Sequence, residues 1–305
     1  MSGQYEANLE AFEEVVASTY YGGEAIPAME VTLGPDQYAG FLGARILAHG
    51  DMSTTWAEAV VDDWSIFEAQ IDREPGGYFD SIRRYMTAAA KYAKGKFLIH
   101  MLDFHSNMDA LSALRGPQNF CLDLYDCPDE VHRALRDVRN TYAEIFDMAY
   151  DAGDMANRGS IGWSPTYCGE GRFAVIQCDF ICMISPEKAR EFVIPAIEEE
   201  AAFLDHSVFH LDGKGALAHL DDILAIDNID VIQWVPGEGQ PRTLFWMDLL
   251  KRIQKAGKSI WVPDWTADEI RALHKELEPD KVVYSLQAPS QAQAENLLLY
   301  LSRNT

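Results

Sequence analysis

The segment His210-Leu211-Asp212-Gly213 combines residue types that can bind a metal ion or transfer a proton. His210 and Asp212 are two positions apart at the end of an apolar run, so on a strand both side chains point the same way. A histidine and a carboxylate in that arrangement suit a metal site, or a base with its orienting partner. The structural alternative is a histidine bonded to a backbone carbonyl and an aspartate that caps the next helix.

A second polar segment, Gln177-Cys178-Asp179-Phe180, also follows an apolar run. Asp179 could position a hydroxyl or an amine of a substrate, and its structural alternative is a helix cap or a buried aspartate. Cys178 could serve as a thiolate, although a lone cysteine beside an apolar run is more often a small core residue. We predict Asp179 as a catalytic residue with His210 and Asp212.

Other polar and aromatic residues follow the remaining apolar runs. Tryptophans in the mouth of a barrel suit flat or ring-shaped ligands. The residues predicted to bind substrate are Trp163, Tyr167, Gln177, Cys178, Gln233, Trp234 and His105.

The segments that must position these residues alternate regularly after Gly153. Alternation of this kind produces βαβ units with a parallel sheet, and this many repeats favours a closed (β/α)8 barrel with its site at the carboxyl ends of the strands. Strands are predicted at 160–163, 173–177, 207–211, 231–235, 259–262 and 281–286, and helices at 186–204, 216–224, 244–256, 267–277 and 291–301.

The first half is predicted to be mostly helical, with one buried strand at 96–102 and an extended segment at 26–33. Helices are expected at 8–18, 35–47 and 78–93, and a long one begins near Cys127. The chain shows no linker and no low-complexity tract. We therefore predict an α/β fold, a (β/α)8 TIM barrel with extra N-terminal helices, as one domain over 1–305.

Composition excludes several classes of protein. A net charge of −23 argues against binding to nucleic acid, which requires clustered lysine and arginine. No stretch approaches the roughly 20 apolar residues of a membrane span, and the acidic N-terminus lacks a secretion signal. Five cysteines without a close pair fit a reducing compartment, so a cytoplasmic location is expected.

Three stretches resemble the uroporphyrinogen decarboxylase-like superfamily: DALSALRGPQNFCLDLYDCPDEV, then CDFICMISPEKAREFVIPAIEEEAAFLDHSVFHLDG, then IDVIQWVPGEGQP. The resemblance implies a (β/α)8 barrel and either of two activities, decarboxylation of uroporphyrinogen or methyl transfer between corrinoid proteins and thiols. True decarboxylases carry an arginine-bearing element near the N-terminus, where this chain reads IPAMEVTLGPDQ and has no arginine before Arg45. Methyl transfer is therefore the favoured activity.

The methyltransferase branch uses a zinc site made of a His-x-Cys element and a later cysteine. His210 matches the histidine, Asp212 replaces the first cysteine, and Gln287 stands where the second is expected. This harder set of ligands predicts a divalent metal such as zinc held by His210 and Asp212, with water in other positions, or no metal at all.

The resemblance further implies a small-molecule substrate and a corrinoid that arrives only on a partner protein, and it leaves a homodimer open. Three alternatives to methyl transfer stay open as well. They are a cofactor-independent decarboxylase or lyase that uses Asp179 and Asp212, an acid–base enzyme on carbohydrate that uses Asp212 and Glu238, and a barrel that only binds a ligand.

Overall fold

The computed structural model describes residues 5–48, 54–263 and 265–305. Its second half is built on one parallel sheet of five strands in the order β11-β10-β9-β8-β7. These strands are β7 (Phe173–Gln177), β8 (His206–Asp212), β9 (Val231–Val235), β10 (Ser259–Val262) and β11 (Val282–Tyr284). β7, β9 and β10 have the bounds that the sequence predicts.

Alternation along these strands separates two apolar layers. Ile176, Phe209 and Ile232 belong to the large cluster that joins the sheet to the helices. Val175, Val208 and Val231, one position away, belong to a smaller cluster on the other face, with Phe173 and Trp261. Because successive side chains of a strand point to opposite faces, His210 and Asp212 share the face of Val208.

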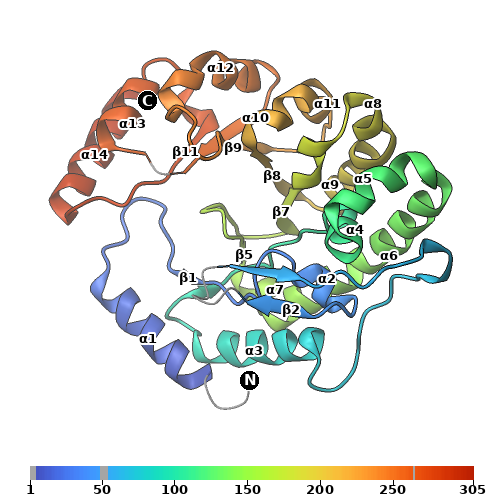
Figure 1. The fold of residues 1–305 in the computed structure, drawn as a ribbon. Coiled ribbons are helices and arrows are strands. Elements are labelled where there is room, and N and C mark those ends of the chain that lie inside the picture. The colour runs from blue at the N-terminus through green and yellow to red at the C-terminus, as the bar shows by residue number, and fades with distance from the viewer. Residues whose placement is uncertain (1–4, 49–53, 264) are drawn as a thin grey trace.

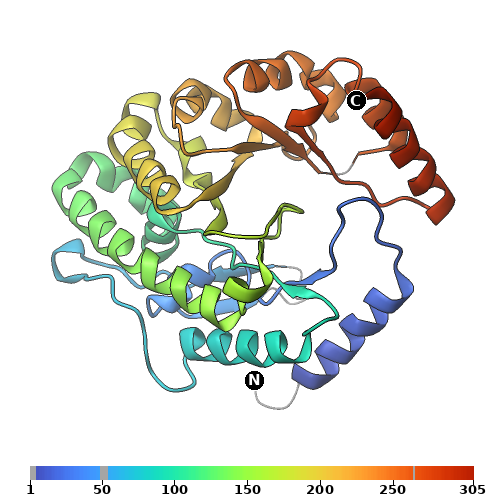
Figure 2. The same ribbon diagram turned by 180° about the vertical axis from the view of Figure 1, so that it is seen from behind.

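Helices cover the outer face of this sheet (Figures 1 and 2). They bury the apolar side of each strand, as expected when βαβ crossovers place helices against a parallel sheet. The helices are α8 (Pro186–Lys188), α9 (Ile194–Phe203), α10 (Gly213–Ala216), α11 (Leu220–Leu224), α12 (Met247–Lys255), α13 (Ala267–Leu273) and α14 (Gln291–Asn304). A 3-10 turn, η2 (Asp179–Met183), follows β7, and a π turn, η3 (Ala189–Val193), joins α8 to α9.

The first half has short strands in three two-stranded sheets. β1 (Ala28–Met29) pairs in parallel with β4 (Leu98–Ile99), while β2 (Ile46–Ala48) with β3 (Thr55–Ala57) and β5 (Ser160–Ile161) with β6 (Tyr167–Cys168) are antiparallel. Its helices are α1 (Tyr5–Ser18), α2 (Gln37–Phe41), α3 (Tyr78–Tyr92), α4 (Asn107–Arg115), α5 (Pro117–Asp126), α6 (Pro128–Ala152) and α7 (Met155–Arg158), with a 3-10 turn η1 (Trp64–Ile66).

The structure differs from the predicted elements in several places of the first half. The helix expected at 35–47 ends at Phe41, because Gly43 takes a φ of +99° and the chain then enters β2. The region between β4 and α6, for which no helix is predicted above, forms α4 and α5.

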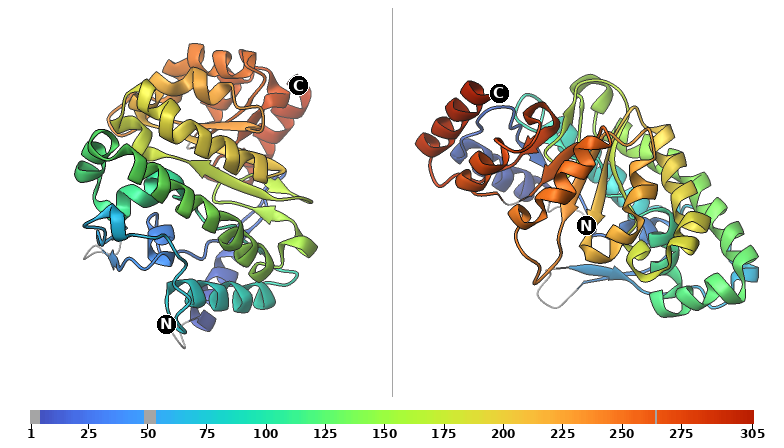
Figure 3. Two further views of the ribbon diagram at one scale, coloured as in Figure 1. Left: turned by 90° about the vertical axis from the view of Figure 1, so that its right-hand side faces the viewer. Right: turned by 90° about the horizontal axis from the view of Figure 1, so that it is seen from above.

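Figure 1 shows strands of both halves towards the middle of the molecule with most helices around them, and Figure 3 shows the same chain from two further sides. The backbone N–H of Met101, after β4, donates to the carbonyl of Ile161 in β5 at 2.7 Å. Gly22 of the first half also lies close to α14 of the second half, because a Cβ added to Gly22 would be only 3.1 Å from Leu298 Cδ1. The fold is therefore a mixed α/β fold with a parallel five-stranded sheet, and closure into a barrel stays a prediction.

Among the described residues, no helix combines the length and the apolar character that crossing a bilayer requires.

Candidate functional site

A polar row crosses the sheet at the carboxyl ends of its strands. The register pairs Gln177 with His210, His210 with Gln233, and Gln233 with Trp261. One pleat earlier, Val175, Val208 and Val231 form an apolar layer. The row of polar side chains therefore lies on an apolar floor, the arrangement expected at the mouth of a parallel α/β structure.

His210 is held by its neighbour on β9. Its Nδ1 lies 2.5 Å from the side-chain oxygen Oε1 of Gln233, which is 2% exposed. An amide oxygen only accepts hydrogen bonds, so Nδ1 carries the proton and Nε2 of the neutral ring keeps its lone pair. That lone pair is what a metal ion or a proton donor needs.

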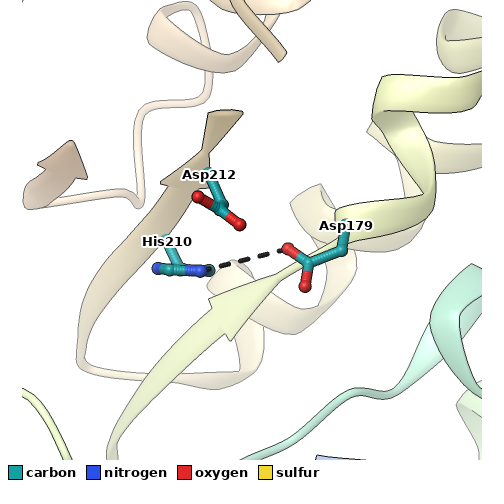
Figure 4. Close-up of side chains that lie close together, drawn as sticks. All are labelled: Asp179, His210 and Asp212. Atoms are coloured by element: carbon teal, nitrogen blue, oxygen red, sulfur yellow. Dashed lines mark ion pairs between the residues drawn. The ribbon is translucent and has the colours of Figure 1, made fainter. Parts of the chain in front are cut away.

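Two carboxylates approach this free nitrogen (Figure 4). His210 Nε2 lies 4.0 Å from Oδ1 of Asp179, the first residue of η2. Asp212 comes from β8 itself, two residues beyond His210. One ligand atom from each of Asp179, His210 and Asp212 lies within 4.8 Å of the others. The structure thus joins all three residues predicted as catalytic.

The structural alternatives for these residues do not hold. The side chain of His210 is bonded to Gln233 rather than to a backbone carbonyl. Asp212 precedes α10 but makes no capping hydrogen bond. The side chain of Asp179 is 45% exposed and so is not a buried structural aspartate.

The three side chains form a suitable set of ligands for a divalent cation. Ligands bound to one ion at about 2.0–2.2 Å lie within about 4.4 Å of one another, so small side-chain rotations would bring these three into range. One imidazole nitrogen and two carboxylates fit zinc or another borderline cation, and they leave coordination positions for water or substrate. Asp179 adds a third ligand to the two that the sequence predicted.

The surroundings of Asp179 change its acidity. Partial burial beside the sheet, followed by the charge of Asp109, raises the pKa of Asp179 to about 6, against an opposing effect from His210. Its carboxyl group can therefore hold a proton in mildly acidic solution and lose it near neutrality.

Gln177 and Trp163, predicted to bind substrate, are both bonded to Asp103. Oδ1 of Asp103 accepts hydrogen bonds from Gln177 Nε2 at 2.7 Å and from Trp163 Nε1 at 3.1 Å. The Trp163 ring meets the His210 ring edge-on at 5.2 Å between centroids and lies 5.8 Å from the Trp261 ring. Trp163 therefore forms an aromatic wall beside His210.

Three residues predicted to bind substrate lie elsewhere. Trp234 follows Gln233, so its side chain turns to the opposite face of the sheet, where it is fully buried against Trp246. Cys178 is buried, and burial raises the pKa of its thiol well above the usual value, which leaves it a neutral core residue. The hydroxyl of Tyr167 donates to the carbonyl of Arg158 before β5. For Trp234 and Cys178 this is a correction, because neither side chain can face the ligand that His210 faces.

A cavity of about 540 Å³ adjoins the site through Asp212. The loop after β9 supplies Glu238 and Arg242, and the segment after β10 supplies Trp265. This volume is sufficient for a small molecule. Glu238 is exposed at its edge.

Sequence reasoning gave no role to Glu200 of α9. This carboxyl is 2% exposed and accepts hydrogen bonds from Ser106 Oγ at 2.6 Å and Asn107 Nδ2 at 3.2 Å. Burial raises its pKa to about 7. Its position three residues after the buried Ile197 was the signal that could have placed it on the inner face of the helix.

Comparison with known proteins supports the fold. No family model and no curated protein matches the chain. Among solved structures, a methyltransferase from Methanosarcina mazei is similar, with a TM-score of 0.64 and 11% sequence identity over 99% of this chain and 87% of that one. At this identity the likeness shows a shared α/β fold and no more.

Proposed function

We propose that this protein is a methyltransferase of the corrinoid-linked type that acts on a small molecule. The observation that carries the proposal is the convergence of Asp179, His210 and Asp212 on one point at the carboxyl ends of β7 and β8. The similarity in fold to a methyltransferase over nearly the whole chain supports the same activity. The corrinoid would arrive on a partner protein.

Each residue has a defined task in this proposal. Nε2 of His210 and the two carboxylates would hold a divalent metal, and the metal would supply the positive charge that keeps a methyl acceptor deprotonated at neutral pH. Gln233 fixes the tautomer of His210 through Nδ1. Trp163 covers one side of the site and limits the access of water, while the cavity beside Asp212 receives the small molecule.

One observation favours a second candidate, a metal-free lyase. Asp179 has a pKa of about 6 and lies close to His210 and Asp212, a pairing that could hold and release a proton beside a substrate. A decarboxylase would use Asp179 as the acid and Asp212 as the ionised partner.

Methyl transfer from free methylcobalamin to the thiol of coenzyme M tests the proposal. The methyl group moves to the thiolate sulfur and the electron pair of the broken bond stays on cobalt, so cob(I)alamin appears as a change in absorbance. We expect the zinc-loaded protein to accelerate this reaction and His210→Ala to abolish the acceleration, with Asp221→Asn, an exposed carboxylate, as the control. Full activity of metal-free protein, or no transfer at all, would contradict the proposal.

A further inference from the structure

A histidine and two carboxylates lie between β4 and the first turn of α4, beside the metal-binding residues. The His105 side chain is 14% exposed, its Nε2 lies 3.4 Å from Asp103 Oδ2, and its Nδ1 lies 3.6 Å from Asp109 Oδ2. Both ring nitrogens face a carboxylate, and only the imidazolium form can donate in both directions. Burial opposes that charge, but Asp103 and Asp109 outweigh it and hold the pKa of His105 well above its usual value.

The Asp109 side of this cluster fixes the turn that carries Asp179. Oδ2 of Asp109 accepts the backbone N–H of Asp179 at 3.0 Å, and Oδ1 accepts that of Phe180 at 2.9 Å. These are the first two amides of η2. A carboxylate that accepts both amides at once sets the position of the Asp179 main chain, and hence the point from which its side chain reaches toward His210.

The Asp103 side of the cluster fixes Trp163 and Gln177, which lie on the other side of the site. Its Oδ1 accepts the hydrogen bonds of Trp163 and Gln177, and its Oδ2 faces His105. Among the described residues, His105 is the one side chain with a cationic form that lies within 4 Å of both carboxylates.

We propose that His105 is a positioning residue, which joins Asp103 to Asp109 and so holds Asp179 and Trp163 in register on the two sides of the site. Without the imidazolium, the buried carboxylate of Asp109 and the partly buried carboxylate of Asp103 would have no compensating cation between them, and one would have to bind a proton or turn away. A change at Asp109 weakens or removes the acceptor of the η2 amides, and a change at Asp103 does the same to the acceptor of Trp163 and Gln177. The part that concerns metal binding rests on the function proposed above.

Hydrogen exchange tests the positioning role without a metal. His105→Gln and His105→Asn each replace the ring with an amide that carries no charge and has both of its N–H donors on one nitrogen. We expect the amides of Asp179 and Phe180 to exchange about tenfold faster or more, because their hydrogen bonds to a charged acceptor become weaker. His206→Gln is the matched control, because His206 is 56% exposed and pairs with Asp230 at the start of β8. Unchanged exchange in both His105 variants would overturn the proposal.

Titration with Co²⁺ tests the consequence for the site. We expect His105→Gln to weaken Co²⁺ binding by about 10–100-fold, as loss of an outer partner of a ligand does. Asp109→Asn should weaken Co²⁺ binding by a similar factor. Because both residues act through the same turn, the double variant should bind Co²⁺ as well as the single variant with the lower affinity. Additive losses would indicate general destabilisation and refute the proposal. If wild-type protein binds no Co²⁺, the proposed metal function fails, and the exchange rates still decide the role of His105.

Discussion

The Nδ1 atom of His210 and the Oε1 atom of Gln233 lie 2.5 Å apart on adjacent strands, paired in register. This contact determines which nitrogen of the ring stays free. It connects the pairing of β8 with β9 to the chemistry of the site, because a shift of register by one residue would replace Gln233 with an apolar neighbour.

Replacing Gln233 with leucine should therefore impair the site more than the fold. Leucine keeps the approximate volume but removes the acceptor of Nδ1–H, so the ring can rotate and change tautomer. We expect Zn²⁺ to bind about 10–100-fold more weakly, measured by competition with a chelating dye. Gln254→Leu is the control, because Gln254 is also buried but donates to the backbone carbonyl of Glu278, away from the site. Equal Zn²⁺ affinity of wild type and Gln233→Leu would contradict this account.

Glu200 makes stability depend on pH. Its pKa rises from an ordinary 4.5 to about 7 in the folded protein, so folding favours the protonated form. The stabilisation from the protonated carboxyl is complete below about pH 4.5 and is lost as the pH rises through about 7. The free energy of unfolding falls by up to about 3 kcal/mol over this range as a result. Glu200→Gln should remove this dependence, so that the variant gains relative to wild type between pH 5 and pH 8.

Urea denaturation at pH 5, 6, 7 and 8 measures the effect. Glu198→Gln is the control, because Glu198 lies on the same helix but is exposed. Parallel curves of unfolding free energy against pH for wild type and Glu200→Gln would show that the buried carboxyl does not titrate in this range.

Substitution of Trp234 should mainly lower stability, whereas substitution of Trp163 should mainly lower activity. Trp234→Ala removes a fully buried ring from the core and should cost about 3–5 kcal/mol of stability. Trp163→Phe removes the N–H donated to Asp103 and part of the ring but keeps an aromatic side chain, so it should slow methyl transfer with a smaller loss of stability. Thermal unfolding and the methylcobalamin assay measure the two effects. A catalytic defect in Trp234→Phe without loss of stability would place Trp234 in the site after all.

The sequence predicted the parts of the fold that depend on local pattern. Apolar runs of four to five residues between turn signals predicted β7, β9 and β10 to the residue, and predicted β8 to within one residue at each end. The end of β7 identified Asp179, and the end of β8 identified His210 and Asp212. Position at the end of a strand and spacing along it are sufficient for that step.

The remainder depended on contacts between distant segments. Gln233 and Trp234 are adjacent, and each is of a type that could line a site. Only the pleat of β9 shows that Gln233 faces His210 while Trp234 faces the helices. Glu200 ends a run of three glutamates that looks solvated, yet it is buried against Ser106. The link from Asp103 through His105 to Asp109 arises from how the start of α4 packs on η2, which no local pattern encodes.

Direct measurement of metal binding tests the central claim, that Asp179, His210 and Asp212 form one metal centre. Purified protein is stripped with a chelator and titrated with Zn²⁺, in parallel with Asp179→Asn, His210→Gln, Asp212→Asn and the exposed control Asp221→Asn. We predict one Zn²⁺ per wild-type and control chain, and markedly weaker binding in each of the three site variants, because each removes one ligand of an N/O set. Stoichiometric zinc retained with unchanged affinity in all three variants, or no binding to wild type, would contradict the account.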